Sequence, residues 1–153
     1  MKTQIKIGVL VTNKKHEMLL IKEKLPNIKR AKWNIIKGTY EDNKETILET
    51  AVRECREEAS IEVGLTHALG IYFYGDKEPR IQFNFLAVAR NDKAAVPDKY
   101  HQKLRNEDIS EVRWFKIEEL TKLKESDYVS RIAYQIIQDW LTTKNKFSLN
   151  LYK

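Results

Sequence analysis

Short apolar runs separated by polar turns fill the first quarter of the chain and predict β-strands. Residues 5–12 form a run rich in β-branched side chains, and residues 17–22 form a second, shorter run. The polar residues 13–16 between them have the composition of a hairpin turn. After a polar loop, residues 33–36 form another apolar run that leads to Gly38. This part of the chain therefore predicts two paired strands and a short third strand.

The region after residue 65 combines strand-like and helix-like patterns. Residues 68–74 and 80–90 read as strands joined by a turn that contains glycine and proline. In the second of these strands one alternate set of side chains is more uniformly apolar, so we expect that side to face the core. The set consists of Ile81, Phe83, Phe85, Ala87 and Ala89. Residues 91–110 predict a long irregular loop. A last strand at 112–115 and a short helix at 117–124 follow.

A helical period returns near the end of the chain. Apolar residues recur at helical spacing from residue 128 onward, and Ser126 is the expected cap of this amphipathic helix. The apolar stripe consists of Tyr128, Val129, Ile132, Ala133, Ile136, Ile137, Trp140 and Leu141. We interpret the stripe as core packing rather than a partner site. Residues 147–151 alternate again, which favours either an edge strand or a dimer contact.

The stretch from residue 38 to residue 61 predicts the central helix of the protein. Asp42, followed three residues later by Glu45, matches a capping signature. One face is apolar and can pack on a core. This face consists of Ile47, Leu48, Ala51, Val52, Cys55 and Ala59. The helix is expected to break at residues 60–64.

Three glutamates lie together on the neighbouring face of this helix. Glu54, Glu57 and Glu58 have the spacing i, i+3 and i+4, which places them within an arc of about 100°. Like charges at this spacing repel one another. A hard divalent cation such as Mg²⁺ removes that penalty, because it binds carboxylate oxygens and leaves water positions for substrate phosphates. The cluster therefore indicates a metal site. A solvated acidic face is the alternative, and the spacing alone leaves both interpretations open.

Composition indicates one soluble globular domain covering residues 1–153. The chain has 153 residues, of which 42% are hydrophobic and 33% charged. Its single cysteine excludes an internal disulfide and a zinc site made of thiolates, which fits a reducing compartment. There is no secretory signal and no apolar run of about 20 residues, so we expect no membrane association and a cytoplasmic location.

The net charge of +6 favours anionic partners only weakly. The densest basic segments are residues 22–32 and 99–105, which could steer a phosphorylated substrate or an RNA end. A solvated basic surface is the preferred interpretation. The three histidines, His16, His67 and His101, show no metal-ligand spacing.

The helix motif resembles the signature of the Nudix hydrolases. Their pattern is Gly, five residues, Glu, seven residues, then Arg-Glu-aliphatic-any-Glu-Glu-any-Gly-aliphatic. Here Glu45 is followed after seven residues by the nine residues RECREEASI at positions 53–61. The resemblance extends to residues 5–22 and 111–120. It implies an α+β fold of the Nudix type, an α/β/α sandwich in which helices flank a mixed β-sheet.

Three positions depart from the family pattern. Gly38 leaves six residues before Glu45 where five are usual, so the loop is one residue longer. Ser60 replaces a glycine, which costs roughly 1 kcal/mol if the backbone there is left-handed. Cys55 replaces an aliphatic residue and can fill the same buried position.

The resemblance also implies a site and a reaction. Glu54, Glu57 and Glu58 would bind Mg²⁺, or Mn²⁺ in its place, and the expected catalytic residues are Arg53, Glu54 and Glu57. Glu54 is the first choice of general base, and Arg53 would orient the carboxylates through paired N–H groups. Glu45 is expected to act through the cap.

Members of the family also recruit a further carboxylate from a loop. The candidates for that carboxylate, which is also an alternative general base, are Glu107, Asp108 and Glu111.

The implied activity is a pyrophosphohydrolase for nucleoside polyphosphates or nucleoside diphosphate derivatives. Lys37 and Gly38 are the expected substrate-binding residues. Together with residues 48–51, they resemble the version of the motif found in hydrolases of dinucleoside polyphosphates. The alternatives are a pyrophosphohydrolase of RNA 5′ ends and a non-catalytic nucleotide-binding module. A small nucleotide is the favoured partner, a nucleic acid is less favoured, and the protein is expected to be a monomer or a homodimer.

Overall fold

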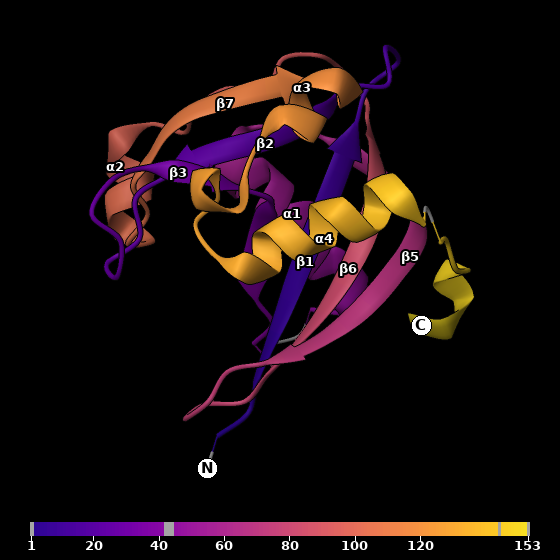
Figure 1. Cartoon of the computed structure of the whole chain (residues 1–153), viewed down its shortest axis with the longest axis horizontal. Helices are drawn as coiled ribbons and strands as arrows, with labels where there is room; N and C mark the ends of the chain where they lie inside the picture. Colours follow the sequence, from indigo (N-terminus) through magenta and orange to yellow (C-terminus); the bar gives the residue numbers. More distant parts are fainter. Residues whose placement is uncertain (1, 42–44, 144, 153) are drawn as a thin grey trace.

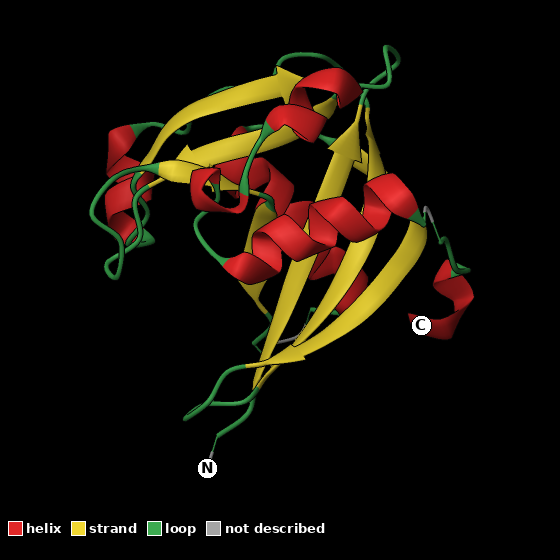
Figure 2. Cartoon of the chain, viewed as in Figure 1, coloured by secondary structure: helices red, strands yellow, loops and turns green. Residues whose placement is uncertain are grey.

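The computed structural model describes residues 2–41, 45–143 and 145–152. Its strands form one mixed sheet (Figures 1 and 2). They are β1 (Gln4–Thr12), β2 (Met18–Glu23), β3 (Lys32–Asn34), β4 (Ile36–Thr39), β5 (Val63–Tyr74), β6 (Arg80–Ala89) and β7 (Ile109–Phe115). The main order is β3-β2-β1-β6-β5, with β4 paired to β1 and β7 to β2. Only β1 and β6 run parallel among these pairs, so the predicted mixed sheet is confirmed.

Helices cover both faces of this sheet. They are α1 (Ile47–Ala59), α2 (Lys99–Leu104), α3 (Ile117–Lys122) and α4 (Arg131–Thr142), with 3₁₀ turns η1 (Glu125–Asp127) and η2 (Leu149–Tyr152). In Figure 2, α4 lies in front of the sheet and α1 behind it. Among the described residues, no helix is long and apolar enough to span a bilayer.

The two layers of core follow from the alternation of side chains along β1. Val9 and its neighbours two residues away pack with Ala51 and Cys55 of α1, whereas Leu10 packs with Ile136 of α4. Successive side chains of a strand point to opposite faces. Because each face meets an apolar helix face, the sheet is buried on both sides. The predicted α/β/α sandwich is confirmed.

Strand β6 is buried on both sides rather than one. Phe85 belongs to the core beneath α1, as predicted, but Gln82 and Asn84 on the opposite side are also buried. Gln82 Nε2 donates to Asn84 Oδ1 at 2.8 Å, and Tyr74 Oη donates to Gln82 Oε1 at 2.7 Å. A Cβ at Gly8 of β1 would collide with both amides, so glycine there leaves room for this polar ladder.

Helix α1 begins later than predicted and ends where predicted. Thr46 is the N-cap: its Oγ1 accepts from the backbone N–H of Glu49 at 3.1 Å, and the Glu49 carboxylate accepts from the Thr46 N–H. The cap predicted from Asp42 and Glu45 is wrong for this helix, because Thr46 and Glu49 complete a capping box of their own. Asp42 itself lies outside the described residues. At the other end Ser60 is left-handed, with φ 53° and ψ 34°, so the cost expected for a serine there applies.

Helix α4 also begins later than predicted. Ser130, not Ser126, is its N-cap, and Ser130 Oγ accepts from the N–H of Ala133 at 3.2 Å. Tyr128 and Val129 are buried, as their apolar character suggests, but in an extended segment. The Val129 N–H donates to the carbonyl oxygen of Trp33 at 2.9 Å. The apolar pattern predicts a helix that starts at Tyr128, but Tyr128 is extended because it pairs with Trp33 of β3.

Other strand boundaries differ from the predicted ones because strand pairing determines where each strand begins and ends. The predicted strand at 33–36 is split into β3 and β4, because β3 pairs with β2 while β4 pairs with β1. Strand β5 begins at Val63, where it pairs with Ala89, five residues before the predicted strand. The predicted edge strand at 147–151 is reduced to one antiparallel bridge between Ala68 and Phe147.

Candidate active site

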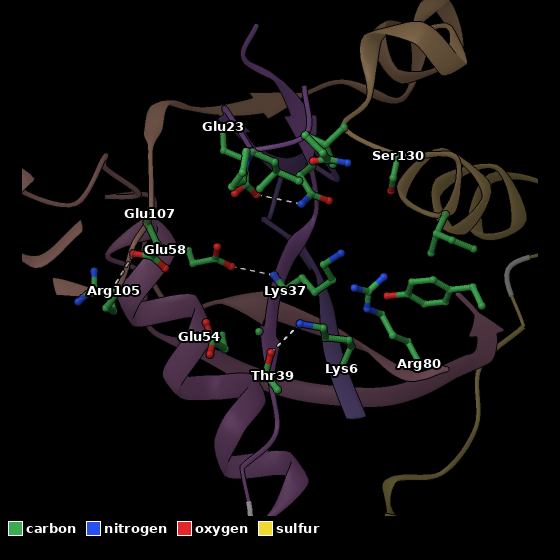
Figure 3. A pocket seen from close by; sticks show the side chains of 18 of the residues that line it. Lys6, Glu23, Lys37, Thr39, Glu54, Glu58, Arg80, Arg105, Glu107 and Ser130 are labelled. Carbon is green, nitrogen blue, oxygen red and sulfur yellow. Dashed lines mark hydrogen bonds and ion pairs between the residues drawn. The ribbon is translucent and has the colours of Figure 1, made fainter. Parts of the chain in front are cut away.

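A cavity of about 840 Å³ opens between α1, the sheet and the start of α4 (Figure 3). Its walls combine acidic side chains from α1 and basic side chains from the strands. The polar residues among its lining are Lys6, Glu23, Asn27, Asn34, Lys37, Thr39, Glu54, Glu58, Tyr74, Arg80, Arg105, Glu107, Ser130 and Arg131. The predicted residues Glu54, Glu58, Lys37 and Gly38 all line this cavity.

Three carboxylates meet at one side of the cavity. Glu54 and Glu58 of α1 and Glu107, which follows α2, each offer an oxygen within 4.8 Å of the others. We call these residues the carboxylate group. Glu54 is 7% exposed and Glu58 is 4% exposed, so both charges are largely removed from water. Such a cluster of hard oxygen donors suits a divalent cation such as Mg²⁺.

A network of hydrogen bonds fixes the position of Glu107 in the loop between α2 and β7. Arg105 Nε donates to Glu107 Oε1 at 2.8 Å, and Arg105 Nη2 donates to the carbonyl oxygen of Glu57 on α1 at 2.9 Å. Gln102 of α2 is buried and accepts from the Ile109 N–H at 2.6 Å. These contacts hold the loop against α1. Of the three candidate loop acids, only Glu107 joins the carboxylate group; Asp108 is exposed, and Glu111 is paired in β7 with β2.

Arg53 bonds the carboxylates as predicted. Its Nε donates to both oxygens of Glu45, at 2.9 and 3.0 Å. Its Nη1 donates to Glu54 Oε1 at 3.1 Å and to Glu57 Oε2 at 3.0 Å. Glu45 therefore contacts Arg53 instead of capping the helix. Glu57 is turned toward Arg53 and lies 3.9 Å from Arg105 Nε, so it is not within the close carboxylate group.

The carboxylate group is electrostatically unfavourable without a cation. Burial raises the pKa of Glu54 to about 7; Arg53 opposes this shift, while Glu57 and Glu107 add to it. Burial also raises the pKa of Glu58 well above its ordinary value, with Glu23 and Glu54 adding to the effect. Both shifts mean that the charged forms are destabilised in this environment. Ligation by a hard cation compensates for that cost, so the residues fit the metal that the motif implies.

Three cations face the carboxylate group across the cavity. Lys6 of β1, Lys37 of β4 and Arg80 of β6 come from three paired strands, and we call them the basic set (Figure 3). Lys6 Nζ donates to Thr39 Oγ1 at 2.6 Å. Burial lowers the pKa of Lys37, against which Glu23 and Glu58 act. This arrangement concentrates positive charge on the wall opposite the carboxylate group (Figure 3).

The two predicted substrate-binding residues also support α1. The backbone N–H of Lys37 donates to Glu58 Oε1 at 2.8 Å. A Cβ at Gly38 would collide with the carboxyl group of Glu54, so glycine allows the helix to approach β4. The connection from Gly38 to Glu45, which is one residue longer than the family pattern, includes residues 42–44, and these lie outside the described residues.

Sequence reasoning missed Lys6, Arg80 and Glu23 as lining residues. Each is a polar position in or at the end of a strand, where a solvated face is the ordinary explanation. The parallel pairing of β1 with β6, which sets Gln4 opposite Arg80, brings Lys6 and Arg80 together. No local signal encodes that pairing. The alternation of Gln4 and Lys6 with Ile5 and Ile7 at the start of the first strand is a local hint of a polar face.

Buried carboxylates that face a row of cations in one cavity suit the hydrolysis of phosphoanhydride bonds, in which metal ions and cations neutralise phosphate charge. The sequence matches the family model of the NUDIX domain over residues 2–135. This chain belongs to the Nudix family, and the enzyme class predicted from the motif is confirmed. No curated protein sequence matches the chain.

Solved structures share the fold over nearly the whole chain. A Nudix hydrolase from Nitrosomonas europaea superposes with a TM-score of 0.79 at 20% identity, over 99% of this chain and 97% of that chain. The MutT protein from Methanosarcina mazei Go1 gives a TM-score of 0.70 at 18% identity, covering 94% and 96%. A C. elegans Ap4A hydrolase, in a binary complex, gives 0.65 at 20% identity, covering 92% and 97%. At these identities the likeness shows the fold.

Proposed function

We propose that the chain is a Mg²⁺-dependent pyrophosphohydrolase that cleaves a phosphoanhydride bond in a nucleoside polyphosphate or a nucleoside diphosphate derivative. The observation that carries this proposal is that one cavity contains both the carboxylate group and the basic set. A polyphosphate needs cations along its length and a metal at the bond that breaks. Cavities of roughly 300–1,000 Å³ accommodate small-molecule ligands, and this one falls in that range.

The carboxylate group is the proposed holder of the metal, with Glu57 as the further ligand implied by the motif. Bound Mg²⁺, or Mn²⁺ in its place, supplies neutralisation of the charge on the phosphate oxygens and a positioned water molecule. The burial of Glu54 and Glu58 supports this assignment, because two buried carboxylates side by side are costly without a cation.

Side chains of the protein bind the substrate and transfer the proton. The basic set binds the non-bridging phosphate oxygens and fixes the scissile anhydride beside the carboxylate group. Glu54 is the first choice to take the proton as the water oxygen bonds to phosphorus and the bridging P–O bond breaks. Glu107 is the alternative base, because it lies in the same group. Arg53 holds Glu54 and Glu57 in register for this step.

A dinucleoside polyphosphate is the finer substrate proposal. It is supported by the resemblance of residues 37–38 and 48–51 to that version of the motif. The Ap4A hydrolase from C. elegans shares the fold, but its substrate is a property of that protein. A long phosphate chain would use all three members of the basic set, whereas a nucleoside diphosphate derivative would need fewer.

The test is product release from a nucleotide panel, with dinucleoside polyphosphates included, in Mg²⁺ and in EDTA. Wild type is compared with Glu57→Gln and with Glu62→Gln as the control. Glu62 is exposed and lies three residues after the end of the same helix. We expect Glu57→Gln to lower kcat by about 10²-fold or more, the scale of losing one group that stabilises the transition state, and Glu62→Gln to behave as wild type. If wild type releases no product from any nucleotide in the panel although it still binds Mg²⁺, the proposal is wrong. If wild type hydrolyses only triphosphorylated RNA, its substrate is the 5′ end of RNA.

A further inference from the structure

Arg80 is a cation of the cavity wall without an acidic partner. It is half-buried, and it belongs to none of the ion pairs among the side chains that the structure describes. Burial lowers the pKa of Lys6, and the charges of Lys37 and Arg80 add to that shift. Cations that repel one another in a cavity favour an anion between them. The direction in which Arg80 points therefore affects how the cavity binds phosphate.

Two side chains on adjoining strands hold Arg80. Strand pairing sets Gln4 of β1 on one side of Arg80 and Tyr74 of β5 on the other. Arg80 Nε donates to Gln4 Oε1 at 3.4 Å, and the guanidinium carbon lies over the Tyr74 ring, 6.0 Å from its centre. The face of a tyrosine ring attracts a cation at this distance. The position of the Tyr74 ring therefore influences where the guanidinium lies.

The Tyr74 ring is held in turn by the polar ladder, which consists of Tyr74, Gln82 and Asn84. Tyr74 Oη donates to Gln82 Oε1 at 2.7 Å, and Gln82 Nε2 donates to Asn84 Oδ1 at 2.8 Å. Asn84 Nδ2 donates to the carbonyl oxygen of Gly70 at 3.0 Å. A carbonyl oxygen can only accept, so Gly70 fixes the orientation of both amides and the tyrosine hydroxyl must donate.

The polar ladder occupies positions that apolar side chains could fill. Gln82 and Asn84 are buried in the sheet, and a Cβ at Gly8 of β1 would collide with both amides. Buried amides lower stability unless their hydrogen bonds are made, and an apolar interior needs none of them. Stability alone does not account for two buried amides and a strand glycine. A fixed position for Tyr74, which lines the cavity, does account for them.

We propose that Tyr74 is a positioning residue, which the polar ladder holds in place so that the Arg80 guanidinium points at a phosphate group of the substrate. The inference rests on the proposed function, because it concerns how that function's basic set is held. Strand β1, which carries Lys6, lies between β4 and β6. In Figure 3, Arg80 is accordingly on the far side of Lys6 from the carboxylate group. The phosphate that Arg80 binds is thus remote from the bond that breaks.

The first test is a double-mutant cycle on the binding of tripolyphosphate, a probe without base or sugar, by calorimetry in EDTA. The variants are Arg80→Gln, Tyr74→Phe and the two combined; Tyr74→Phe keeps the ring and removes the hydrogen bond to Gln82. We expect Arg80→Gln to weaken binding at least about 10-fold, as for a charge-assisted contact, and Tyr74→Phe to weaken it about 3-fold. In the Arg80→Gln background Tyr74→Phe should have no effect, because Tyr74 acts through Arg80.

Matched controls separate this role from charge and folding effects. Lys77→Gln makes the same change of charge on the exposed turn between β5 and β6, and Tyr100→Phe removes an exposed hydroxyl from α2. Both should bind tripolyphosphate as wild type does. If Tyr74→Phe does not give the thermal unfolding transition of wild type, Tyr74→Gln serves in its place. Glutamine can still donate to Gln82 but has no ring beneath Arg80.

Steady-state kinetics gives a second readout. Because Arg80 is remote from the breaking bond, Arg80→Gln and Tyr74→Phe should raise KM for the hydrolysed nucleotide and leave kcat within about 3-fold of wild type. A loss confined to kcat contradicts the inference. So do failure of wild type to bind tripolyphosphate, wild-type binding by Arg80→Gln, and losses from the two substitutions that add.

The outcome for hydrolysis is separable from the outcome for Tyr74. If no nucleotide is hydrolysed but the two substitutions are non-additive in tripolyphosphate binding, the proposed function is wrong and the positioning role stands. If nucleotides are hydrolysed and both variants keep the KM of wild type, the proposed function stands and the positioning role is wrong.

Discussion

At the scale of single residues, Arg53 determines the arrangement of the predicted catalytic carboxylates. One guanidinium bonds Glu45 through Nε, and Glu54 and Glu57 through Nη1. Its side chain is partly exposed, but its three partners hold it in one orientation. The two carboxylates that contact Nη1 would repel each other without it. We therefore propose that Arg53 acts on the reaction through Glu54 and Glu57.

Arg53→Ala is expected to lower kcat by about 10–100-fold, with a smaller effect on KM, the range found when a residue that orients metal ligands is lost. Arg53→Lys should recover only part of the rate, because an ammonium group cannot bond three carboxylates in the fixed geometry of a guanidinium. Steady-state kinetics with Mg²⁺ measures both effects. Arg56→Ala, on the exposed side of α1, is the matched control. Equal rates for the Arg53 and Arg56 variants would contradict this role.

The raised pKa of Glu54 makes the stability of the metal-free protein depend on pH. The pKa is about 7 in the folded protein, against an ordinary value of 4.5, because burial disfavours the charged form. The folded state thus binds this proton more tightly than the unfolded state does. The contribution to stability is fully present below about pH 4.5 and is lost as the pH rises through about 7. Glu58, whose pKa is raised for the same reason, acts in the same direction.

Glu54→Gln should therefore stabilise the metal-free protein relative to wild type by an amount that grows between pH 5 and about 8. Urea unfolding in EDTA at several pH values measures the difference in the free energy of unfolding. Glu118→Gln, at an exposed position of α3, is the control and should show no such trend. A difference between Glu54→Gln and wild type that does not vary with pH would show that the Glu54 carboxyl is not destabilised by burial.

At the scale of elements, helix α1 presents the carboxylates because its ends and its buried face are fixed. The capping box of Thr46 and Glu49 holds the first turn, and Ala51 and Cys55 are fully buried against the sheet. The last turn ends at Ser60, whose N–H donates to the Arg56 carbonyl oxygen at 3.0 Å in a left-handed conformation. Glycine is favoured there because it has no Cβ to clash.

Ser60→Gly should raise the free energy of unfolding by up to about 1 kcal/mol, because it relieves the left-handed strain at the end of α1. For a chain of this size, 1 kcal/mol corresponds to about 2–4 °C in Tm. Thermal unfolding measures the shift, with Ser60→Ala as the matched variant. Alanine keeps the Cβ, so it should give no gain. An equal gain from alanine would show that the backbone conformation is not the cause.

At the scale of the whole molecule, local features could be predicted from sequence and long-range ones could not. The buried face and the glutamates of α1 lie within one helix of 13 residues, so one local pattern contains them, whereas the same pattern misplaces the N-cap, which is Thr46. Helix α2 was missed because it is six residues long and buries only Gln102. Selecting Glu107 from three nearby acids required Arg105 and Gln102 to place the loop. Lys6 and Arg80 meet through the pairing of β1 with β6, which no local pattern contains.

The sandwich creates the site by joining these distant parts. Helix α1 and the loop after α2 supply the carboxylate group, the strands supply the basic set, and the start of α4 closes the cavity near β3 (Figure 3). We propose that Glu107 completes a metal site with Glu54 and Glu58. These residues come from segments far apart in the sequence, so the site exists only in the folded chain.

Binding of Mn²⁺, followed by electron paramagnetic resonance, tests that claim most directly. Wild type is compared with Glu107→Gln and with Asp108→Asn, the neighbouring acid that lies outside the carboxylate group. We predict that Glu107→Gln weakens Mn²⁺ binding by at least about 10-fold and that Asp108→Asn leaves it unchanged. Wild-type affinity in Glu107→Gln, or an equal loss in Asp108→Asn, would contradict the site described here.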